Sequence, residues 1–571
     1  MTDRPTDQPA ANWPAGVAPP AAVNYTFSAS EIEQLRQFGE AHDHSEGAVL
    51  FSEGDKAVDC LIVLSGQLDV LVTDAGETRR IGWMTPGQFS GDLAVLTGQT
   101  TLATGKMAEA GTLLHISQEN FQRLLVENSA LSDVFIRAFV ARRAWARTSG
   151  LATTVVVGSR ADRTVFAIRD LLTKHEVNHA WINSDEDPVA EKILTTKGFT
   201  RDDLPVVLRG SSLALRRPDL RDVSEAYGLD LLPDGACADV LIVGAGPAGL
   251  AASVYAASEG LSVLTIDTDG PGGQAGTSSK IENYLGFPTG ISGRELANNA
   301  AVQAQKFGVR IASPARAEKL EPLADGTAYC LTLVDGRAFK AKGVVIATGA
   351  QYRKLPIDHL ESFEGRGIYY GATPMEAQLC MEQDVAVVGA GNSAGQGAVF
   401  LSQSARRVHV LYRRPDIRET MSEYLVRRLE ETPNIHLHPK TEIDAFQGDG
   451  HLSRIDLRVG GKTGDCLATP YVFLFIGAAP FTNWLPETLA TGPRGFIKTG
   501  SDLGNLDLVK AQWRLDRMPS RYETSLPRVY AVGDVRIGSV KRVANAVGEG
   551  SVVVSDIHAA LAEIAEAAAQ G

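Results

Sequence analysis

Three glycines in the middle of the chain have the spacing of a phosphate-binding turn. Gly244, Gly246 and Gly249 follow the apolar segment DVLIV and open a segment with a helical pattern. The first glycine permits a tight turn, the second lets the backbone approach a pyrophosphate, and the third lets the helix pack closely on the strand. Amide groups at the helix N-terminus add donors and a positive dipole. Asp267 ends the next apolar segment, where a carboxylate would bind ribose hydroxyls, so the pattern predicts a dinucleotide site.

A second turn repeats this pattern further along the chain. After the apolar segment VAVV, the positions of the motif are occupied by Gly389, Gly391 and Ala394. The strand that follows ends not in an acid but in a group of arginines, Arg413, Arg414 and Arg418. Guanidinium groups pair bidentately with a 2′-phosphate, whereas an adenosine ribose diol would lack an acidic acceptor there. The pattern therefore favours NADPH over NADH, with a solvated basic turn as the alternative.

Each turn needs its own strand–turn–helix unit to position it. Residues 238–355 run from ADVLIVGAGPAG to GVVIATGA, and residues 356–490 start a similar unit at QDVAVVGAGNSAG. Residues 500–571 return to the first unit and close with PRVYAVGDV and a long Ala-rich helix. Two such Rossmann-like folds are what a hydride relay needs, because one holds FAD and the other delivers the nicotinamide to its ring.

The N-terminal part predicts smaller domains. Residues 1–25 are rich in Pro and Ala and predict a disordered lead-in. Residues 26–147 alternate apolar and polar residues in AVLFSEGD and CLIVLSGQLDVLV, as strands of a barrel do, and end in a helical stretch. Residues 152–228 have a β–α–β pattern. The predicted fold class is multidomain, with an all-β barrel and flanking helices, a small α/β domain and two α/β dinucleotide-binding domains.

Composition excludes several classes of function. The net charge is −13, which argues against a nucleic-acid or anionic-membrane partner. No apolar run is long enough for a membrane span, and no secretory signal is present, so a cytoplasmic protein is expected. The 5 cysteines are far apart and none forms a CxxC pair, which excludes a local redox dithiol. The closely spaced histidine pairs have no third ligand, so no metal site is predicted: His42 with His44 and His436 with His438.

From residue 238 onward the chain resembles the low-molecular-weight thioredoxin reductases. The matching motifs beyond GAGPAG are GGQAGTSSKIENYLGFP, ATGA, GAGNSA with YRR, and AVGD. The resemblance implies a homodimer that binds FAD through one set of residues: Gly244, Gly246, Pro247, Ala248, Gly249, Asp267, Gly273, Gln274, Asn283, Ala347, Thr348, Gly349, Gly533, Asp534, Arg542, Val543 and Ala544. It implies NADPH binding through another: Gly389, Gly391, Asn392, Ser393, Ala394, Arg413, Arg414 and Arg418.

One departure from that family bears on the chemistry. Where the family carries Cys-Ala-Thr-Cys, this chain reads GATP, with Gly371 and Pro374 at the two cysteine positions. Neither residue forms a thiolate, and Cys380 is one half of such a motif at most. Because thiol–disulfide exchange needs an attacking thiolate, electrons cannot leave the flavin by the family's route. No catalytic residue is assigned.

Residues 26–147 resemble the cyclic-nucleotide-binding domain of the cAMP-receptor class. The stretch PGQFSGDLAVLTGQTTLATG matches the layout of its phosphate-binding cassette, with Gly91, Asp92, Leu93 and Thr101 at the ligand positions. The family has Glu and Arg where this chain has Asp92 and Thr101, so the phosphate loses its charged partner. This favours a degenerate or altered ligand site over cAMP-type binding. A module for dimerisation and docking is the alternative.

Residues 152–228 resemble the glutaredoxin/thioredoxin fold. In this resemblance Pro205 is the family's cis-proline, and the active-site cysteines are replaced in the stretch SRADRT, Ser159 to Thr164. The block would then be a thiol-free module for packing or partner docking.

The combined prediction is an FAD-dependent oxidoreductase that passes hydride from NADPH to FAD and electrons to an external acceptor. That acceptor would be a redox protein, a quinone, a disulfide substrate or oxygen. One alternative is a nucleotide-regulated redox sensor with little turnover. Another is a disulfide reductase that uses the cysteines of its partner, with Cys380 as the contact.

Overall fold

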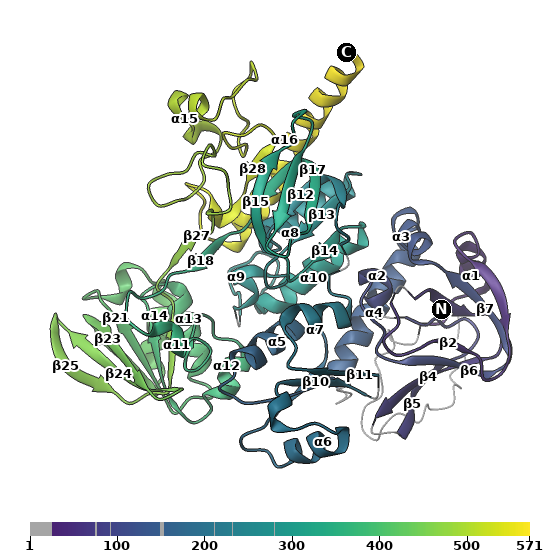
Figure 1. Cartoon of the computed structure of the whole chain (residues 1–571), viewed down its shortest axis with the longest axis horizontal. Coiled ribbons are helices and arrows are strands. Elements are labelled where there is room, and N and C mark those ends of the chain that lie inside the picture. Colours follow the sequence, from purple (N-terminus) through teal and green to yellow (C-terminus); the bar gives the residue numbers. More distant parts are fainter. Residues whose placement is uncertain are drawn as a thin grey trace. The chain divides into compact units, whose positions relative to one another are not determined.

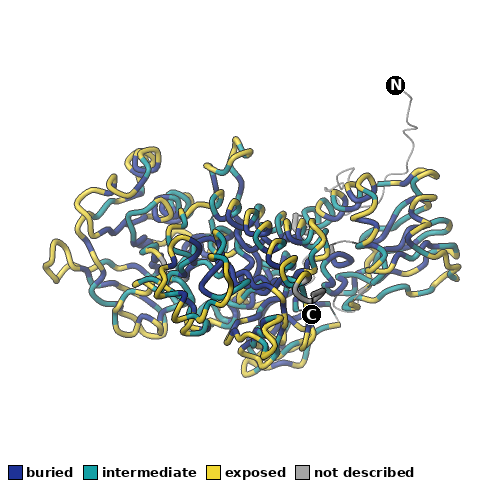
Figure 2. The backbone as a smooth tube through the Cα atoms, turned by 90° about the horizontal axis from the view of Figure 1, so that it is seen from above, coloured by how far each residue is buried: buried dark blue, intermediate teal, exposed yellow. Residues whose placement is uncertain are grey.

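The computed structural model describes residues 25–56, 58–74, 77–91, 93–148, 154–210, 212–230, 232–278 and 280–570. The chain divides into two compact units. The first comprises the described residues up to Gly158 together with Glu176–Leu229, and the second comprises Ser159–His175 and Asp230–Gly571. Figure 2 shows buried backbone inside each unit and exposed residues along its outer loops. Among the described helices, none is long and apolar enough to cross a membrane.

The first unit contains a barrel-like pair of sheets. One sheet has the order β1 (Glu40–His44), β7 (Gly111–Ile116) and β3 (Cys60–Val63). The other has the order β2 (Val49–Phe51), β6 (Thr104–Glu109), β4 (Gln67–Asp74) and β5 (Glu77–Met84). Apolar side chains that alternate along these strands form the core between them: Leu61, Val63, Leu68, Met107 and Leu113. The short helices of this part are α1 (Ala29–Leu35) and α2 (Leu93–Thr97).

The helical stretch after the barrel consists of two helices, α3 (Gln118–Glu127) and α4 (Ser129–Thr148). The break falls at Asn128, whose backbone is extended and whose side chain accepts a hydrogen bond from the Leu131 amide at 3.1 Å. An Asn at this point caps the second helix because its side-chain oxygen satisfies an amide that has no partner within the helix.

Four short strands follow, in the sheet order β11 (Leu213–Arg216), β10 (Val206–Arg209), β8 (Thr154–Gly158) and β9 (His179–Asn183). Strands β8 and β9 are parallel, and β10 is antiparallel to both of its neighbours. The Leu204–Pro205 peptide that leads into β10 is cis. Helices α5 (Arg163–Lys174) and α6 (Val189–Lys197) lie between these strands in the sequence, and α7 (Leu220–Tyr227) follows β11. Helix α5 belongs to the second unit.

The second unit contains the sheet that carries the first glycine-rich turn (Figure 1). Its order is β14 (Arg310–Ala312), β13 (Val263–Ile266), β12 (Cys237–Val243), β17 (Ala338–Ile346), β16 (Tyr329–Leu333) and β15 (Ala317–Pro322). Strand β28 (Val529–Ala531) pairs in parallel with β17, so the last part of the chain returns to this sheet. Its helices are α8 (Pro247–Ser258), α9 (Gly273–Gly276), α10 (Gly293–Lys306), α15 (Asn505–Lys510) and α16 (Val543–Gln570).

The second glycine-rich turn lies on a parallel sheet of order β19 (Ile368–Tyr369), β26 (Tyr471–Leu474), β20 (Asp384–Val388), β21 (Arg407–Tyr412) and β22 (Ile435–Pro439). An antiparallel sheet joins it, formed by β23 (Thr441–Gly448), β24 (Leu452–Val459) and β25 (Lys462–Leu467). The helices here are α11 (Leu360–Phe363), α12 (Pro374–Leu379), α13 (Asn392–Leu401) and α14 (Glu423–Glu431). The chain enters this domain through β18 (Ala350–Tyr352) and leaves it through β27 (Ala478–Pro480), which pair with each other.

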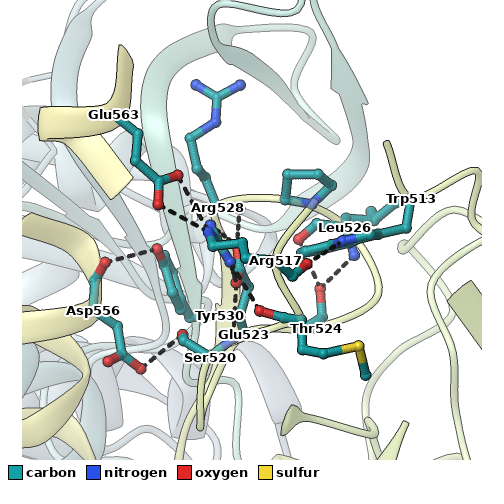
Figure 3. Close-up of polar contacts among 12 residues, drawn as sticks. Trp513, Arg517, Ser520, Glu523, Thr524, Leu526, Arg528, Tyr530, Asp556 and Glu563 are labelled. Atoms are coloured by element: carbon teal, nitrogen blue, oxygen red, sulfur yellow. Dashed lines mark hydrogen bonds and ion pairs between the residues drawn. The ribbon is translucent and has the colours of Figure 1, made fainter. Parts of the chain in front are cut away.

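A buried ion pair holds the returning segment to the last helix (Figure 3). The Glu523 side chain is 0% exposed and accepts hydrogen bonds from the Arg517 guanidinium at 2.6 and 3.2 Å. It also accepts the backbone amides of Ser520 and Arg528. Arg517 pairs in turn with Glu563 of α16 at 2.9 Å. A buried carboxylate with this many donors is well compensated, so the network fixes β28 relative to α16.

Candidate functional site

Close backbone contacts explain the glycines of the first turn, between β12 and α8. Gly244 has a φ of +109°, and a Cβ there would lie 2.4 Å from the Ala347 carbonyl oxygen. A Cβ on Gly249 would lie 1.8 Å from the Gly244 carbonyl oxygen. Gly246 precedes Pro247, the first residue of α8. The turn is thus an open backbone cradle at a helix N-terminus, which is the geometry that binds a pyrophosphate.

Asp267 follows β13, and its carboxylate braces this turn. One oxygen accepts the Ala245 amide at 2.7 Å, and the other accepts the amides of Asp269 and Gly270 at 2.9 Å. The residue also faces the cavity beside the turn. Its position suits the predicted contact with a ribose, and the structure adds a local role that the spacing did not indicate.

A single cavity of 1790 Å³ extends along both glycine-rich turns. Every residue predicted to bind FAD lines it except Gly249, Asn283 and Ala544. Every residue predicted to bind NADPH lines it except Ala394 and Arg418. Residues far apart in the sequence are therefore brought to one continuous space that both glycine-rich turns line.

Residues between the end of β28 and the start of α16 also line this cavity. Asp534 is half-buried, and burial raises the pKa of its carboxyl, with Lys541 3.7 Å away as a partly compensating cation. The Gly533 amide donates to Glu549 at 2.6 Å, which orients the loop. Arg542 and Val543 lie at the N-terminus of α16. A helix N-terminus here stabilises negative charge in the cavity.

The second turn, between β20 and α13, is built in the same way. Gly389 has a φ of +144°, and a Cβ there would lie 2.5 Å from the Phe475 carbonyl oxygen. A Cβ on Gly391 would meet nothing within 4 Å, so this position is open to a ligand. Asn392 begins α13, and its side chain exchanges hydrogen bonds with Ser422 at 2.8 and 2.9 Å.

The arginines after β21 have different surroundings. Arg413 lines the cavity and has no hydrogen bond or ion pair within the described part of the chain. Arg414 also lines it and pairs with Glu419 at 2.5 Å. Arg418 instead points to Glu430, at 2.7 Å, so its place in the predicted phosphate site is not supported by its contacts. Arg458 of β24 lines the cavity as well, a contribution from a distant strand that no local motif signalled.

Of the two positions that carry cysteines in the resembling family, one lines this cavity and the other begins a helix. Gly371 lines the cavity, and Pro374 is the first residue of α12. Cys380 is fully buried, and burial raises the pKa of its thiol to about 12. A thiol of this kind stays protonated and inaccessible, which makes it a poor nucleophile.

Helix α5 supplies a wall of the cavity that sequence reasoning missed. The lining residues from this helix are Arg163, Phe166, Ala167, Asp170 and Lys174. The Phe166 ring lies 5.8 Å from that of Tyr369, and Lys174 pairs with Asp170 at 2.6 Å. Burial lowers the pKa of Lys174, but Asp170 and Asp269 outweigh it and raise the pKa overall. At the helix end, His175 and Ser313 are hydrogen-bonded at 2.6 Å.

The cassette positions of the barrel lie in the first unit. Gly91 has a φ of +106°, and Leu93 begins α2. Thr101 is buried and donates to the Ser52 carbonyl oxygen at 2.7 Å. Asp92 lies outside the described residues.

Comparison with known proteins places this geometry in a family. Residues 238–550 match the model of the pyridine nucleotide-disulphide oxidoreductases. The chain belongs to this family. Residues 42–128 match the model of the cyclic nucleotide-binding domain.

Members of the family that resemble the chain include several thioredoxin reductases. The enzyme of Bacillus subtilis is 30% identical over 57% of this chain and 96% of its own. That of Treponema pallidum is 33% identical over 57% of this chain and 97% of its own. The crystal structure of the T. acidophilum enzyme matches with a TM-score of 0.50 and 28% identity, over 57% of this chain and 98% of that chain.

These matches confirm the resemblance to thioredoxin reductases and the cyclic-nucleotide-binding domain that the sequence predicted. They also confirm the cofactor prediction at the level of the family, which works with FAD and NADPH. The chain's own residues fit these groups, because glycines leave the backbone open at both turns and basic side chains face the cavity.

Proposed function

We propose that the protein is an NADPH-dependent flavin oxidoreductase that reduces an external acceptor without an internal dithiol. The observation that carries the proposal is the single cavity, which joins both dinucleotide cradles and has Gly371 where the family has a thiol. Bound FAD and NADPH would supply the hydride-transfer chemistry. The protein's part is to hold the two dinucleotides in one space and to shield them from water.

Particular groups of the protein would bind and select the two dinucleotides. The turns at Gly244 and Gly389 direct helix amides at the pyrophosphates, and Asp267 holds the first turn in shape. Arg413 and Arg414 recognise a 2′-phosphate and so select NADPH. The N-terminus of α16, at Val543, would stabilise negative charge on a cofactor held in this part of the cavity.

The experiment is anaerobic mixing of the purified protein with NADPH, with flavin absorbance as the readout. We expect bleaching in one enzyme-bound step, and faster bleaching with NADPH than with NADH. An unchanged spectrum at saturating NADPH would refute the proposal. A panel of acceptors (thioredoxins, quinones, small disulfides and oxygen) then measures turnover, and thioredoxin should give none because no thiolate pair is available.

A sensor with little turnover is the second candidate, and the barrel that matches the cyclic-nucleotide-binding domain favours it. A sensor would be reduced by NADPH but would turn over with no acceptor of the panel. Use of a partner's cysteines through Cys380 is less well supported, since that thiol is buried and has a raised pKa.

We further propose a thioredoxin-type fold for residues 152–228 and a cytoplasmic homodimer for the whole chain. The sheet order β11-β10-β8-β9, with β8 and β9 parallel, supports this fold. The stretch Ser159 to Thr164, which leads from β8 into α5, has no cysteine, so the block would act through packing rather than redox chemistry. Sedimentation equilibrium tests the dimer, and a monomer at micromolar concentration would contradict it.

A further inference from the structure

A hairpin from outside the barrel contacts its cassette within the first unit. Strands β10 and β11 are joined at Gly210, where a Cβ would lie 2.5 Å from the Thr73 carbonyl oxygen of the barrel. The Thr100 amide donates to the Tyr227 carbonyl oxygen at the end of α7, at 3.1 Å. The hairpin and α7 therefore pack directly on the barrel.

Arg209, the last residue of β10, enters this contact. Its side chain is 4% exposed, and its guanidinium donates to the Thr100 hydroxyl at 2.7 Å. The guanidinium also lies over the Tyr227 ring, 4.8 Å from its centre. A positive charge is thus buried against Thr100, next in sequence to Thr101, the cassette position at which the resembling family has an arginine.

The hydrogen bonds of this guanidinium are incomplete. Its Nε is buried and has no hydrogen-bond partner within the described residues. The nearest carboxylate oxygen, on Glu53, is 3.8 Å from Nε, beyond hydrogen-bonding distance, and accepts instead from the Ser212 hydroxyl at 3.1 Å. The buried Glu53 carboxylate balances the charge at this distance but leaves the Nε donor of Arg209 without an acceptor. A buried donor without an acceptor is costly to keep, so its retention calls for a ligand that supplies one.

We propose that Arg209 completes an anion site at the cassette of the barrel and that this site takes the phosphate of a cyclic nucleotide. The matched domain, residues 42–128, contains Glu53 and Thr100 but not Arg209, so the cation comes from a different part of the chain. A phosphodiester carries one negative charge and several acceptor oxygens, which suits a guanidinium fork. The Glu53 carboxylate is the anion that would compete with this phosphate for Arg209, and it accepts a hydrogen bond from the Ser212 hydroxyl.

Isothermal titration of the full-length holoprotein with cAMP and with cGMP tests this site. We expect one of them to bind the wild type at one site per chain. Arg209→Gln should weaken binding at least about 30-fold, because it removes a desolvated charge partner. Arg216→Gln is the matched control: it removes the same charge from the same hairpin, but Arg216 is 57% exposed and should not change the affinity.

Two more variants separate a ligand site from a structural ion pair. Glu53→Gln removes the competing carboxylate and should tighten binding, whereas a purely structural pair would weaken it as Arg209→Gln does. Arg209→Lys keeps the charge but loses the two parallel donors of the guanidinium. Its affinity for the nucleotide should lie between those of the wild type and Arg209→Gln. Circular dichroism and flavin content verify that each variant is folded.

Three results would overturn the proposal: no binding of either nucleotide by the wild type up to about 1 mM, equal binding by wild type and Arg209→Gln, or loss of binding in Glu53→Gln.

Discussion

The two glycine-rich turns share their architecture but differ in the charge carried at the end of the second strand. In each turn a parallel strand runs through a positive-φ glycine into a helix, at Gly244 and at Gly389. After β13 the chain places Asp267, whose carboxylate is bonded to backbone amides. After β21 it places Arg413, whose guanidinium has no such bond within the described residues.

This difference separates the contribution of the fold from the selectivity of individual residues. The turn and helix N-terminus recognise any pyrophosphate, because their donors are backbone amides. The charge after the second strand decides which ribose is accepted, because an acid suits a free diol and an arginine suits a 2′-phosphate. Substitutions at matched positions of the two turns can test that division, beginning with the largest expected effect.

Gly249→Ala should abolish FAD binding. Its Cβ would lie 1.8 Å from the Gly244 carbonyl oxygen, so α8 must move away from the first turn. The second turn already has Ala394 at the corresponding position, which makes Ala394→Gly the matched control with normal flavin content. The ratio of flavin to protein absorbance after purification measures both, and stoichiometric FAD in Gly249→Ala would contradict this explanation.

Arg413→Ala should raise the KM for NADPH by about 10- to 100-fold, because it removes a charged hydrogen-bond partner of a phosphate. The KM for NADH should change little, since NADH has no 2′-phosphate. Arg418→Ala serves as the control, because that side chain is bound to Glu430. Steady-state kinetics with both nucleotides decides the matter, and a parallel loss with NADH would indicate a structural effect.

Each turn also has an acid near the start of its first strand, and the two acids should differ in their effect on stability. Hydrogen bonds from Arg407 and Arg406, at 2.5 and 2.9 Å, hold the pKa of Asp384 below its usual range. Near neutral pH the ionised carboxylate adds stability, which is lost as the pH falls through this lowered folded pKa. Asp384→Asn should lower the free energy of unfolding by about 2 kcal/mol at neutral pH. The difference from wild type should shrink below about pH 4.

Asp239 is the matched residue before the first turn. Partial burial raises the pKa of its carboxyl, but hydrogen bonds from Lys342 and Ser262 lower it overall. Its side chain is more exposed than that of Asp384, so Asp239→Asn should cost less stability. Urea titrations at several pH values measure both variants. Equal losses, or a loss in Asp384→Asn that grows in acid, would be inconsistent with this assignment.

The smallest effect on activity is expected from substituting the cysteines near the two turns. Cys237 is the exposed first residue of β12, whereas Cys380 before β20 is buried and its thiol has a raised pKa. A thiol reagent at mild alkaline pH should label Cys237 rapidly and Cys380 slowly. Cys380→Ser should leave turnover unchanged with every acceptor. Loss of turnover in that variant would instead support the hypothesis of disulfide exchange through Cys380.

Much of the nucleotide-binding architecture was predictable because its signals are local. Glycine spacing, the apolar strand before it and the charge after the next strand all lie within one short segment around Gly244 or Gly389. The missing cysteines were equally visible, since Gly371 and Pro374 stand within a recognisable motif. The break at Asn128 between α3 and α4 was missed, because the helical periodicity continues on both sides of it.

The sequence by itself determined that two dinucleotide turns exist, which charge comes after each, and that no dithiol is available. The tertiary structure alone decided three further points: α5 lines the cavity along both glycine-rich turns, Arg418 pairs with Glu430, and Arg209 lies beside Thr100. Each of these depends on contacts between residues far apart in the sequence or on the direction of a long side chain. Such contacts are set by packing and burial, which spacing along the chain does not encode.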